Sequence, residues 1–167
     1  MTNALISQVR RLLAAGATAL LALAAPLAQA QVVTYGAPID LDTAKKIAAA
    51  AIAEAKKNNF TMAVAVTDTA GDLVYFEKMD GTQTGSVDVS QGKARSAVRF
   101  KRPTKVFQEI EAAGGDGLRI LGLQGAVPVE GGIPIVVGGK IVGAIGTSGG
   151  SSAQDGQVAT AGLAALK

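Results

Sequence analysis

Two β-branched runs flank a pair of glycines late in the chain, at Ile133–Val137 and Lys140–Thr147. Gly138 and Gly139 between them adopt positive φ without a Cβ penalty, as the tight turn of a β-hairpin requires. Both runs are apolar almost throughout, so we expect these strands to need cover on more than one face. The pattern predicts a hairpin at the centre of the sheet, with Pro134, which has no N–H, at an edge or a bulge.

The rest of the chain alternates helical and strand patterns. Between Asp40 and Asn58, apolar residues recur every three or four positions, which predicts an amphipathic helix with Asp40 as its N-cap. Alternating runs at Thr61–Thr67 and Leu73–Met79 predict a second hairpin. Further helices are predicted at residues 87–100, at residues 104–112 and from residue 151 onward, with a flexible glycine-rich loop at residues 114–117. We therefore predict an α+β fold in which helices pack against an antiparallel sheet of four to five strands, in the order α-β-β-α-α-β-β-α.

Local signals refine the predicted helices. Pro103 suits the first position of the helix that follows it, because its missing N–H would be unpaired there anyway. In the last helix, Ser152 and Asp155 have the spacing of a capping box, with Asp in place of Glu. The predicted buried face of the helix at residues 87–100 consists of Val89, Ala94, Ala97 and Val98.

The composition favours one compact domain with an aliphatic core. The chain has 167 residues, of which 49% are hydrophobic and only 4% aromatic, and it contains no Cys, His or Trp. Disulfides and thiolate chemistry are therefore excluded, together with the side chain most used to bind zinc or haem iron and to transfer protons near neutral pH. The acidic residues form no spaced cluster, so no metal site is predicted.

The first 30 residues have the organisation of a secretory signal peptide. Arg10 and Arg11 precede an apolar stretch from Leu12 to Leu23, and Ala28-Gln29-Ala30 supplies small residues for cleavage. An uncleaved membrane anchor is the less favoured alternative, because the stretch is shorter than the ~20 residues that span a bilayer. We predict cleavage after residue 30 and a periplasmic or secreted single domain at residues 31–167, without stable membrane insertion.

The charge balance gives no reason to expect a nucleic-acid partner. The whole chain carries 16 basic and 13 acidic residues, a net charge of +3. Without the two arginines of the leader, 14 basic residues face 13 acidic ones, which leaves +1. A near-neutral domain lacks the electrostatic footprint of a nucleic-acid binder. One dense basic run could face carboxylates or phosphates, although a solvated helix face is the commoner explanation for such a run. It comprises Lys93, Arg95, Arg99, Lys101, Arg102 and Lys105.

One motif formally matches a nucleophile elbow. Gly146-Thr147-Ser148-Gly149-Gly150 has the G-x-S-x-G pattern between a predicted strand and a predicted helix. A serine nucleophile needs a base, however, and this chain has no histidine to supply one. A glycine-rich exit from a strand explains the motif better, and the N–H groups at residues 151–153 could hold an anionic group. We predict no catalytic residue, and an enzyme is the less favoured function.

An ordered set of motifs resembles the family of the haem-binding protein HbpS and the glycolate-operon protein GlcG. The motifs are Val64-Ala-Val-Thr-Asp68, Gly71-Asp-Leu-Val-Tyr-Phe-Glu-Lys-Met-Asp-Gly81, Gly92-Lys-Ala94, Phe100-Lys-Arg-Pro-Thr104, Gly131-Gly-Ile-Pro-Ile-Val-Val137 and Val142-Gly-Ala-Ile-Gly-Thr-Ser-Gly-Gly150. The resemblance extends from about Asp40 to Lys167. It implies a layered α/β domain with an antiparallel sheet, assembly into homo-oligomers and, in some members, binding of haem or a related tetrapyrrole.

The resemblance also suggests residues for a ligand pocket. Without histidine, any haem would be held by Met, Tyr, Lys, a weak hydroxyl or no protein ligand. We therefore expect a small planar anion, with haem as one possible cofactor, in a pocket between the Lys93 helix and the late hairpin. Lys93 and Arg102 would pair with its carboxylates, and Gly131 and Gly132 would let it approach the backbone closely. The predicted ligand-binding residues are Met79, Asp80, Lys93, Phe100, Arg102, Gly131 and Gly132.

Two other functions stay open at this point. The protein could be an accessory or sensory partner that has no ligand of its own and acts through an oligomer surface. It could also be a small-molecule enzyme that uses Lys93 or an acid, although no constellation of catalytic groups is assembled in the sequence. In either case we expect a homo-oligomer, because alanine-rich helices expose flat surfaces and a chain of this size buries only a moderate share of its surface.

Overall fold

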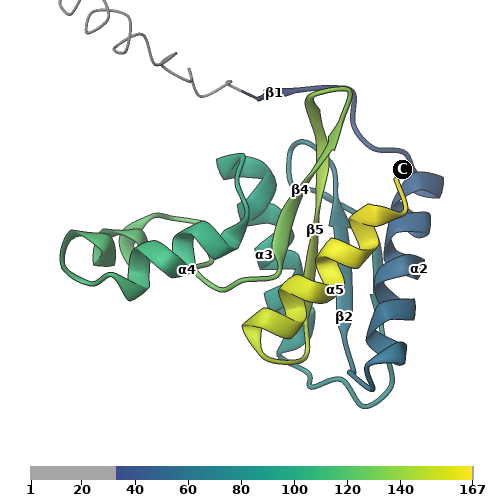
Figure 1. Ribbon diagram of the computed structural model, residues 1–167. Coiled ribbons are helices and arrows are strands. Elements are labelled where there is room, and N and C mark those ends of the chain that lie inside the picture. The colour runs from purple at the N-terminus through teal and green to yellow at the C-terminus, as the bar shows by residue number, and fades with distance from the viewer. Residues whose placement is uncertain (1–32, 167) are drawn as a thin grey trace, which may run out of the picture. The chain divides into compact units, whose positions relative to one another are not determined.

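The helices and strands follow one another in the predicted order, with two additions, a short first strand and a 3-10 helix (Figure 1). The computed structural model describes residues 33–166, so the predicted signal peptide lies outside the described residues. The elements are β1 (Thr34–Tyr35), α2 (Leu41–Lys57), β2 (Ala63–Thr67), β3 (Leu73–Lys78), α3 (Ser86–Phe100), α4 (Thr104–Ala112), the 3-10 helix η2 (Gly115–Gly122), β4 (Gly132–Val137), β5 (Lys140–Ser148) and α5 (Ser152–Ala164). Within the described part of the chain, none of the helices combines the length and the hydropathy that a membrane span needs.

β5 is the central strand of the sheet. It pairs antiparallel with β4 and with β2, and β3 pairs antiparallel with β2. The prediction of a purely antiparallel sheet is wrong in one respect, because β1 pairs parallel with β5 and places Thr34 beside Lys140. A strand of two residues is too short to show a periodicity in the sequence. Side-chain contacts hold it, since the Tyr35 hydroxyl donates to the Val98 carbonyl at 2.9 Å and Lys101 Nζ lies 4.4 Å from the Tyr35 ring centroid.

The late hairpin has the predicted turn, but only β5 of its two strands lies at the centre of the sheet. Gly138 and Gly139 connect β4 to β5 with φ angles of 56° and 75°, in the region that glycine tolerates. β5 is buried over most of its length. β4 pairs only with β5 among the described strands, so Pro134 lies on an edge strand, as its missing N–H requires.

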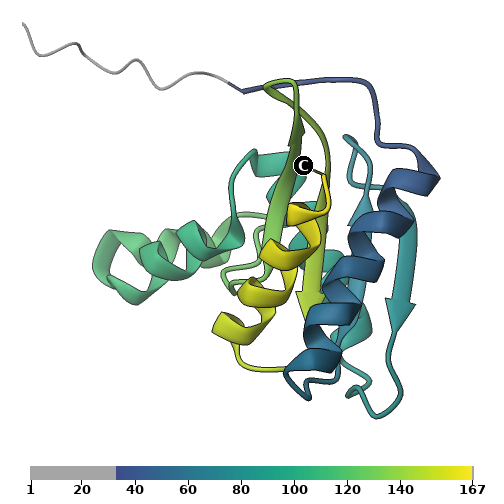
Figure 2. The same ribbon diagram turned by 45° about the vertical axis from the view of Figure 1, so that its right-hand side comes forward.

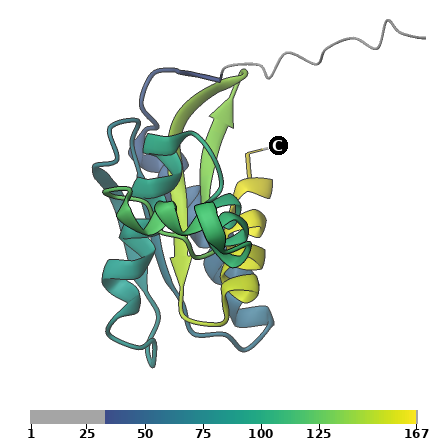
Figure 3. The ribbon, with the colours of Figure 1, turned by 90° about the vertical axis from the view of Figure 1, so that its left-hand side faces the viewer.

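Helices cover both faces of this sheet, which gives three layers (Figures 2 and 3). α2 and α5 pack on one face, where Ile47 meets Val64 and Val66 of β2. α3 packs on the other face, where Ala97 meets Ala65 of the same strand. Successive residues of a strand point to opposite faces, so β2 contributes to both cores.

The sequence predicts α2 well and the orientation of α3 less well. The Asp40 side chain accepts a hydrogen bond from the Thr43 N–H at 2.7 Å and caps α2 as expected. In α3, however, Val89 is 40% exposed and Lys93 is 1% exposed, so Val89 does not belong to the buried face. The reason is close packing, because a Cβ at Gly146 of β5 would clash with the α3 backbone. Mostly small residues therefore fill the buried face of α3, and apolarity alone does not identify them.

α4 and η2 form an arm that projects from the domain (Figures 1 and 2). Pro103 is the N-cap of α4 rather than its first residue. The predicted flexible loop at residues 114–117 is a wrong prediction, because the chain enters η2 at Gly115. Gly117 makes the arm compact, since a Cβ there would clash with the Ile110 carbonyl of α4.

The start of α5 differs from the prediction by one residue. Ser151 is the N-cap, and it forms a capping box with Gln154 instead of the predicted pair of Ser152 and Asp155. Both pairs have the same spacing, so the sequence pattern fits either. The difference frees the carboxylate of Asp155, which is buried and points into the domain.

Candidate functional site

A buried ion pair lies between α3 and α5, where the sequence predicts a ligand pocket. Lys93 Nζ lies 2.6 Å from Asp155 Oδ2, and the two side chains are 1% and 3% exposed. Lys93 also donates to the Thr147 carbonyl of β5 at 3.1 Å, and the Thr147 hydroxyl donates to the Asp155 carbonyl at 2.6 Å. The carboxylate that faces Lys93 therefore comes from within the chain.

Burial is the largest electrostatic effect on this pair. It lowers the pKa of Lys93 and raises the pKa of Asp155, because each charged form loses its hydration. The contact between the two groups opposes both pKa shifts. Gly150 adds a backbone N–H, which donates to Asp155 Oδ1 at 3.1 Å. The charges are thus paired and hydrogen-bonded, but removing one partner would leave the other charge buried without compensation.

Gly131 and Gly132 bring β4 against this ion pair. A Cβ at Gly131 would lie 3.0 Å from Lys93 Nζ, and one at Gly132 would clash with the Lys93 carbonyl. Gly131 also has a φ of 126°, which side chains rarely adopt. The Gly132 N–H donates to the Thr104 hydroxyl at 2.9 Å. These glycines therefore allow β4 itself, and not a ligand as predicted, to approach Lys93 closely.

Met79 and Asp80 lie at a different place, a surface hollow at the end of β3. The hollow has a volume of about 370 Å³ and is lined by Lys56, Glu77, Lys78, Met79 and Asp80. Met79 is partly buried against the core, and its N–H donates to the Met62 carbonyl at 3.0 Å. Lys56 and Lys78 are exposed. We call this arrangement the Met79 hollow, and its lining combines one methionine with two lysines and two carboxylates.

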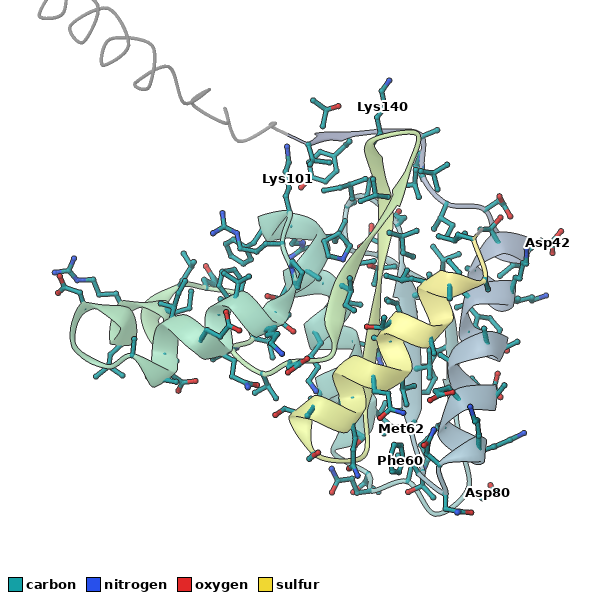
Figure 4. All side chains as sticks on the ribbon, in the orientation of Figure 1. Asp42, Phe60, Met62, Asp80, Lys101 and Lys140 are labelled. Atoms are coloured by element: carbon teal, nitrogen blue, oxygen red, sulfur yellow. The ribbon has the colours of Figure 1, made fainter. Side chains whose placement is uncertain are left out.

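Phe100 and Arg102 lie at a third place, where α3 meets α4. The Phe100 and Phe107 rings meet edge to face with centroids 5.3 Å apart, and the Arg102 guanidinium carbon lies 5.7 Å from the Phe107 centroid. Figure 4 labels Lys101 in this region and Asp80 at the opposite end of the domain. The structure thus brings together Lys93, Gly131 and Gly132, and it leaves the other four predicted residues at two separate places.

The glycine-rich segment before α5 has a packing role. The Ser148 hydroxyl donates to the Ser86 hydroxyl at 3.1 Å, and Ser148 is buried. Among residues 33–166 no general base contacts it, so this part of the chain does not supply the second member of a catalytic dyad. Of the N–H groups at residues 151–153 that were predicted to hold an anion, that of Ser151 is already used, because it donates to Gln154 Oε1 at 2.9 Å.

A second hollow of about 320 Å³ escaped the sequence analysis. It is lined by Ala37, Pro38, Ile39, Asp40, Thr43, Val137, Val142 and Leu166. Three segments that are distant in sequence build it, namely the lead into α2, the late hairpin and the end of the chain. No local pattern signals such a convergence. Sequence analysis also missed Lys56 and Lys78 of the Met79 hollow. Only Lys78 could have been inferred, because it directly precedes the predicted ligand residue Met79.

The Met79 hollow fits haem in part. A methionine thioether is a known axial ligand of haem iron, and two lysines suit the two carboxylates of a tetrapyrrole. The volume of about 370 Å³ is at the small end of the range for ligand pockets. Among residues 33–166, no group of three or more His, Cys, Asp or Glu residues is placed to hold a metal ion. The hollow therefore offers such a ligand two cations and one thioether, next to the carboxylates of Glu77 and Asp80.

Sequence comparison relates the chain to one protein family and to individual bacterial proteins. A family model described as "Haem degrading protein HbpS-like" matches residues 39–164. Protein GlcG of Escherichia coli strain K12 is 41% identical over 105 residues, which cover 63% of this chain and 77% of GlcG. A 15.0 kDa protein of Citrobacter freundii, encoded between dhaT and dhaS, is 34% identical over 121 residues, which cover 71% of this chain and 85% of the relative.

Structure comparison gives a consistent result. A double mutant of HbpS from Streptomyces reticuli superposes with a TM-score of 0.73 at 30% identity, covering 84% of this chain and 94% of HbpS. The crystal structure of PduOC in complex with haem superposes with a TM-score of 0.69 at 25% identity, covering 77% of this chain and 94% of PduOC.

Proposed function

The chain belongs to the HbpS-like family, and from this premise we propose that it is an exported, oligomeric protein that binds haem or another planar anionic tetrapyrrole. Family membership and the haem complex of PduOC support the ligand class. The sequence of the first 30 residues supports export.

The ligand site of this proposal is the Met79 hollow. Other candidate cations are occupied, since Lys93 pairs with Asp155 and Arg102 lies over Phe107. Lys56 and Lys78, by contrast, are exposed and form no ion pair within the described part of the chain. The single observation that carries the proposal is a hollow whose lining combines the partly buried Met79 with these two exposed lysines.

Three side chains of the hollow would hold the ligand. Lys56 and Lys78 would pair with its carboxylates, and Met79 would offer its sulfur to the iron and its methylenes to the ring. Glu77 is held in place because the Tyr75 hydroxyl donates to its Oε2 at 3.1 Å. Haem, when bound, would supply a redox-active iron. Exposed charge pairs contribute little each, so we expect modest affinity.

Titration of hemin, followed by visible absorption, tests this site. Replacing Lys56 and Lys78 together by Ala removes two exposed charge pairs and should weaken binding by about fivefold, roughly 1 kcal/mol. The matched control replaces Lys45 and Lys46 by Ala. These two lysines lie on the same helix, about 16 Å from Lys56 by the helical rise. The control should bind like the parent. Parental affinity in the Lys56/Lys78 variant would exclude the Met79 hollow as the site.

Export is tested separately by intact mass. Protein recovered from the cell envelope should begin at Gln31, because the apolar stretch of the leader is too short to serve as a stable membrane anchor. Recovery of a membrane-bound chain that still begins at Met1 would contradict export with cleavage.

A further inference from the structure

The arm, residues 104–122 with the short segment that follows to residue 125, exposes apolar side chains over most of its length. Between residues 109 and 125 only Ile120 is buried. The exposed large apolar side chains of this stretch are Ile110, Leu118, Leu121 and Leu123, and Leu121 is 61% exposed. A soluble monomer seldom gathers so many large apolar side chains on one small projection, and such a gathering marks an interaction surface.

The geometry of η2 separates its inner side from its outer side. Residues three apart lie on the same side of a 3-10 helix. Gly117 and Ile120 share the inner side, because Gly117 is packed against the Ile110 carbonyl and Ile120 is buried. Leu118 and Leu121 share the next side, and both are at least half exposed. The outward leucines therefore form a row that the arm's own packing against α4 leaves uncovered.

Charge divides the arm into two halves of opposite sign. The base of the arm, taken with the residues just before it, carries Lys101, Arg102 and Lys105, a charge of +3 that Glu130 beside Lys105 reduces to +2. The outer part carries three acids, Glu109, Glu111 and Asp116, and one base, Arg119, a charge of −2. Such a surface is complementary to itself when two copies lie antiparallel, because the basic base of each arm then faces the acidic outer part of the other.

We propose that the arms of two copies of this chain pack antiparallel about a two-fold axis, with the Leu118 and Leu121 rows in contact. The partner is a second copy because both the apolar row and the charge halves complement themselves under that symmetry. The inference rests on the proposed homo-oligomer and names the surface that forms it. It is independent of where the tetrapyrrole binds.

Light scattering on the chain without its leader tests the apolar row. Leu121→Glu places a charge in the proposed contact and should lower the mass measured at micromolar concentration. The control Leu41→Glu changes a residue that is 47% exposed on α2, away from the arm, and should keep the parental mass. Circular dichroism should be unchanged in both variants, since both side chains are exposed, and thermal unfolding should be lowered only in Leu121→Glu, which loses the stabilisation by assembly. A monomeric parent, or a parental mass in Leu121→Glu, would overturn the proposal.

Charge swapping tests the antiparallel arrangement. Glu109→Lys with Glu111→Lys makes the whole arm more basic, and Arg102→Glu with Lys105→Glu makes it more acidic. Each variant alone should repel its own copy and show a lower mass, whereas an equal mixture should regain the parental mass. A mixture that stays at the lower mass would contradict the arrangement.

Hemin titration of Leu121→Glu distinguishes this proposal from the proposed ligand site. The Met79 hollow should bind hemin as in the parent even where assembly is lost.

Discussion

Lys93 and Asp155 are the buried charges that connect α3 to α5. Their contact of 2.6 Å is surrounded by the Thr147 carbonyl and the Gly150 N–H. A buried pair of this kind contributes little net stability compared with apolar residues of the same volume, because both ions lose their hydration. Its importance lies in the cost of breaking it, since either charge alone would be stranded in the interior.

Lys93→Ala should therefore lower the free energy of unfolding by about 3–5 kcal/mol. Lys93→Met combined with Asp155→Leu removes both charges and should recover most of that loss. Lys105→Ala is the control, because Lys105 lies 3.3 Å from Glu130 but is 54% exposed, and an exposed pair contributes less than about 1 kcal/mol. Urea denaturation measures all three. A loss below 1 kcal/mol in Lys93→Ala would show that the pair is not critical to the fold.

The sequence identifies Lys93 as unusual but does not identify its partner. The signal was its place in the dense basic run and in the family motifs, since Lys93 lies at the middle of α3, where the helix dipole has little effect. Asp155 is 62 residues away and sits in a pattern that also fits a capping box. Ion pairing over such a distance depends on the tertiary packing of α3, β5 and α5, and no local pattern contains that information.

At the scale of elements, the cap of α2 makes a pH-dependent contribution to stability. The carboxylate of Asp40 accepts hydrogen bonds from the Thr43 N–H at 2.7 Å and the Thr43 hydroxyl at 2.9 Å. These bonds lower the pKa of Asp40 below its ordinary value of 3.8. The stabilisation is thus fully present above the unfolded pKa and is lost as the pH falls through the lower folded pKa.

Asp40→Asn should separate this titration from the rest of the molecule. Asparagine caps a helix about as well as aspartate but does not ionise, so its contribution stays constant with pH. The stability of the parent relative to this variant should be constant above about pH 5 and should decrease below the ordinary pKa of Asp40. Thermal unfolding of both proteins across that range measures the difference. An increase in the parent's relative stability on acidification would contradict the assigned cap.

The elements that the sequence predicts best are those with strong local periodicity. α2 and both hairpins agree closely with the prediction, because their apolar spacing and turn glycines act within a few residues. The buried face of α3 was missed at Val89, since the glycine at position 146 selects small and polar residues for that face. The 3-10 helix was missed because Gly115 and its neighbours resemble a flexible loop.

At the scale of the whole molecule, the first strand turns an antiparallel sheet into a mixed one. Thr34 and Tyr35 pair with the central strand β5, so the segment directly after the predicted cleavage point is part of the sheet. Of the predicted ligand residues, Lys93, Gly131 and Gly132 lie together at one place. Met79 and Asp80 lie elsewhere, because the positions of loops and strand ends follow from topology and not from residue type.

We propose that this chain binds a planar anionic tetrapyrrole at the Met79 hollow. The most direct test is to titrate hemin and iron-free protoporphyrin into the parent and into Met79→Leu. If Lys56 and Lys78 are the main anchors, both ligands should bind the parent with affinities within about tenfold, a difference of roughly 1.4 kcal/mol. Met79→Leu keeps the volume but removes the sulfur, so it should shift the Soret band of bound hemin and leave protoporphyrin binding unchanged. Failure of both ligands to bind, or binding that disappears without iron, would contradict the account.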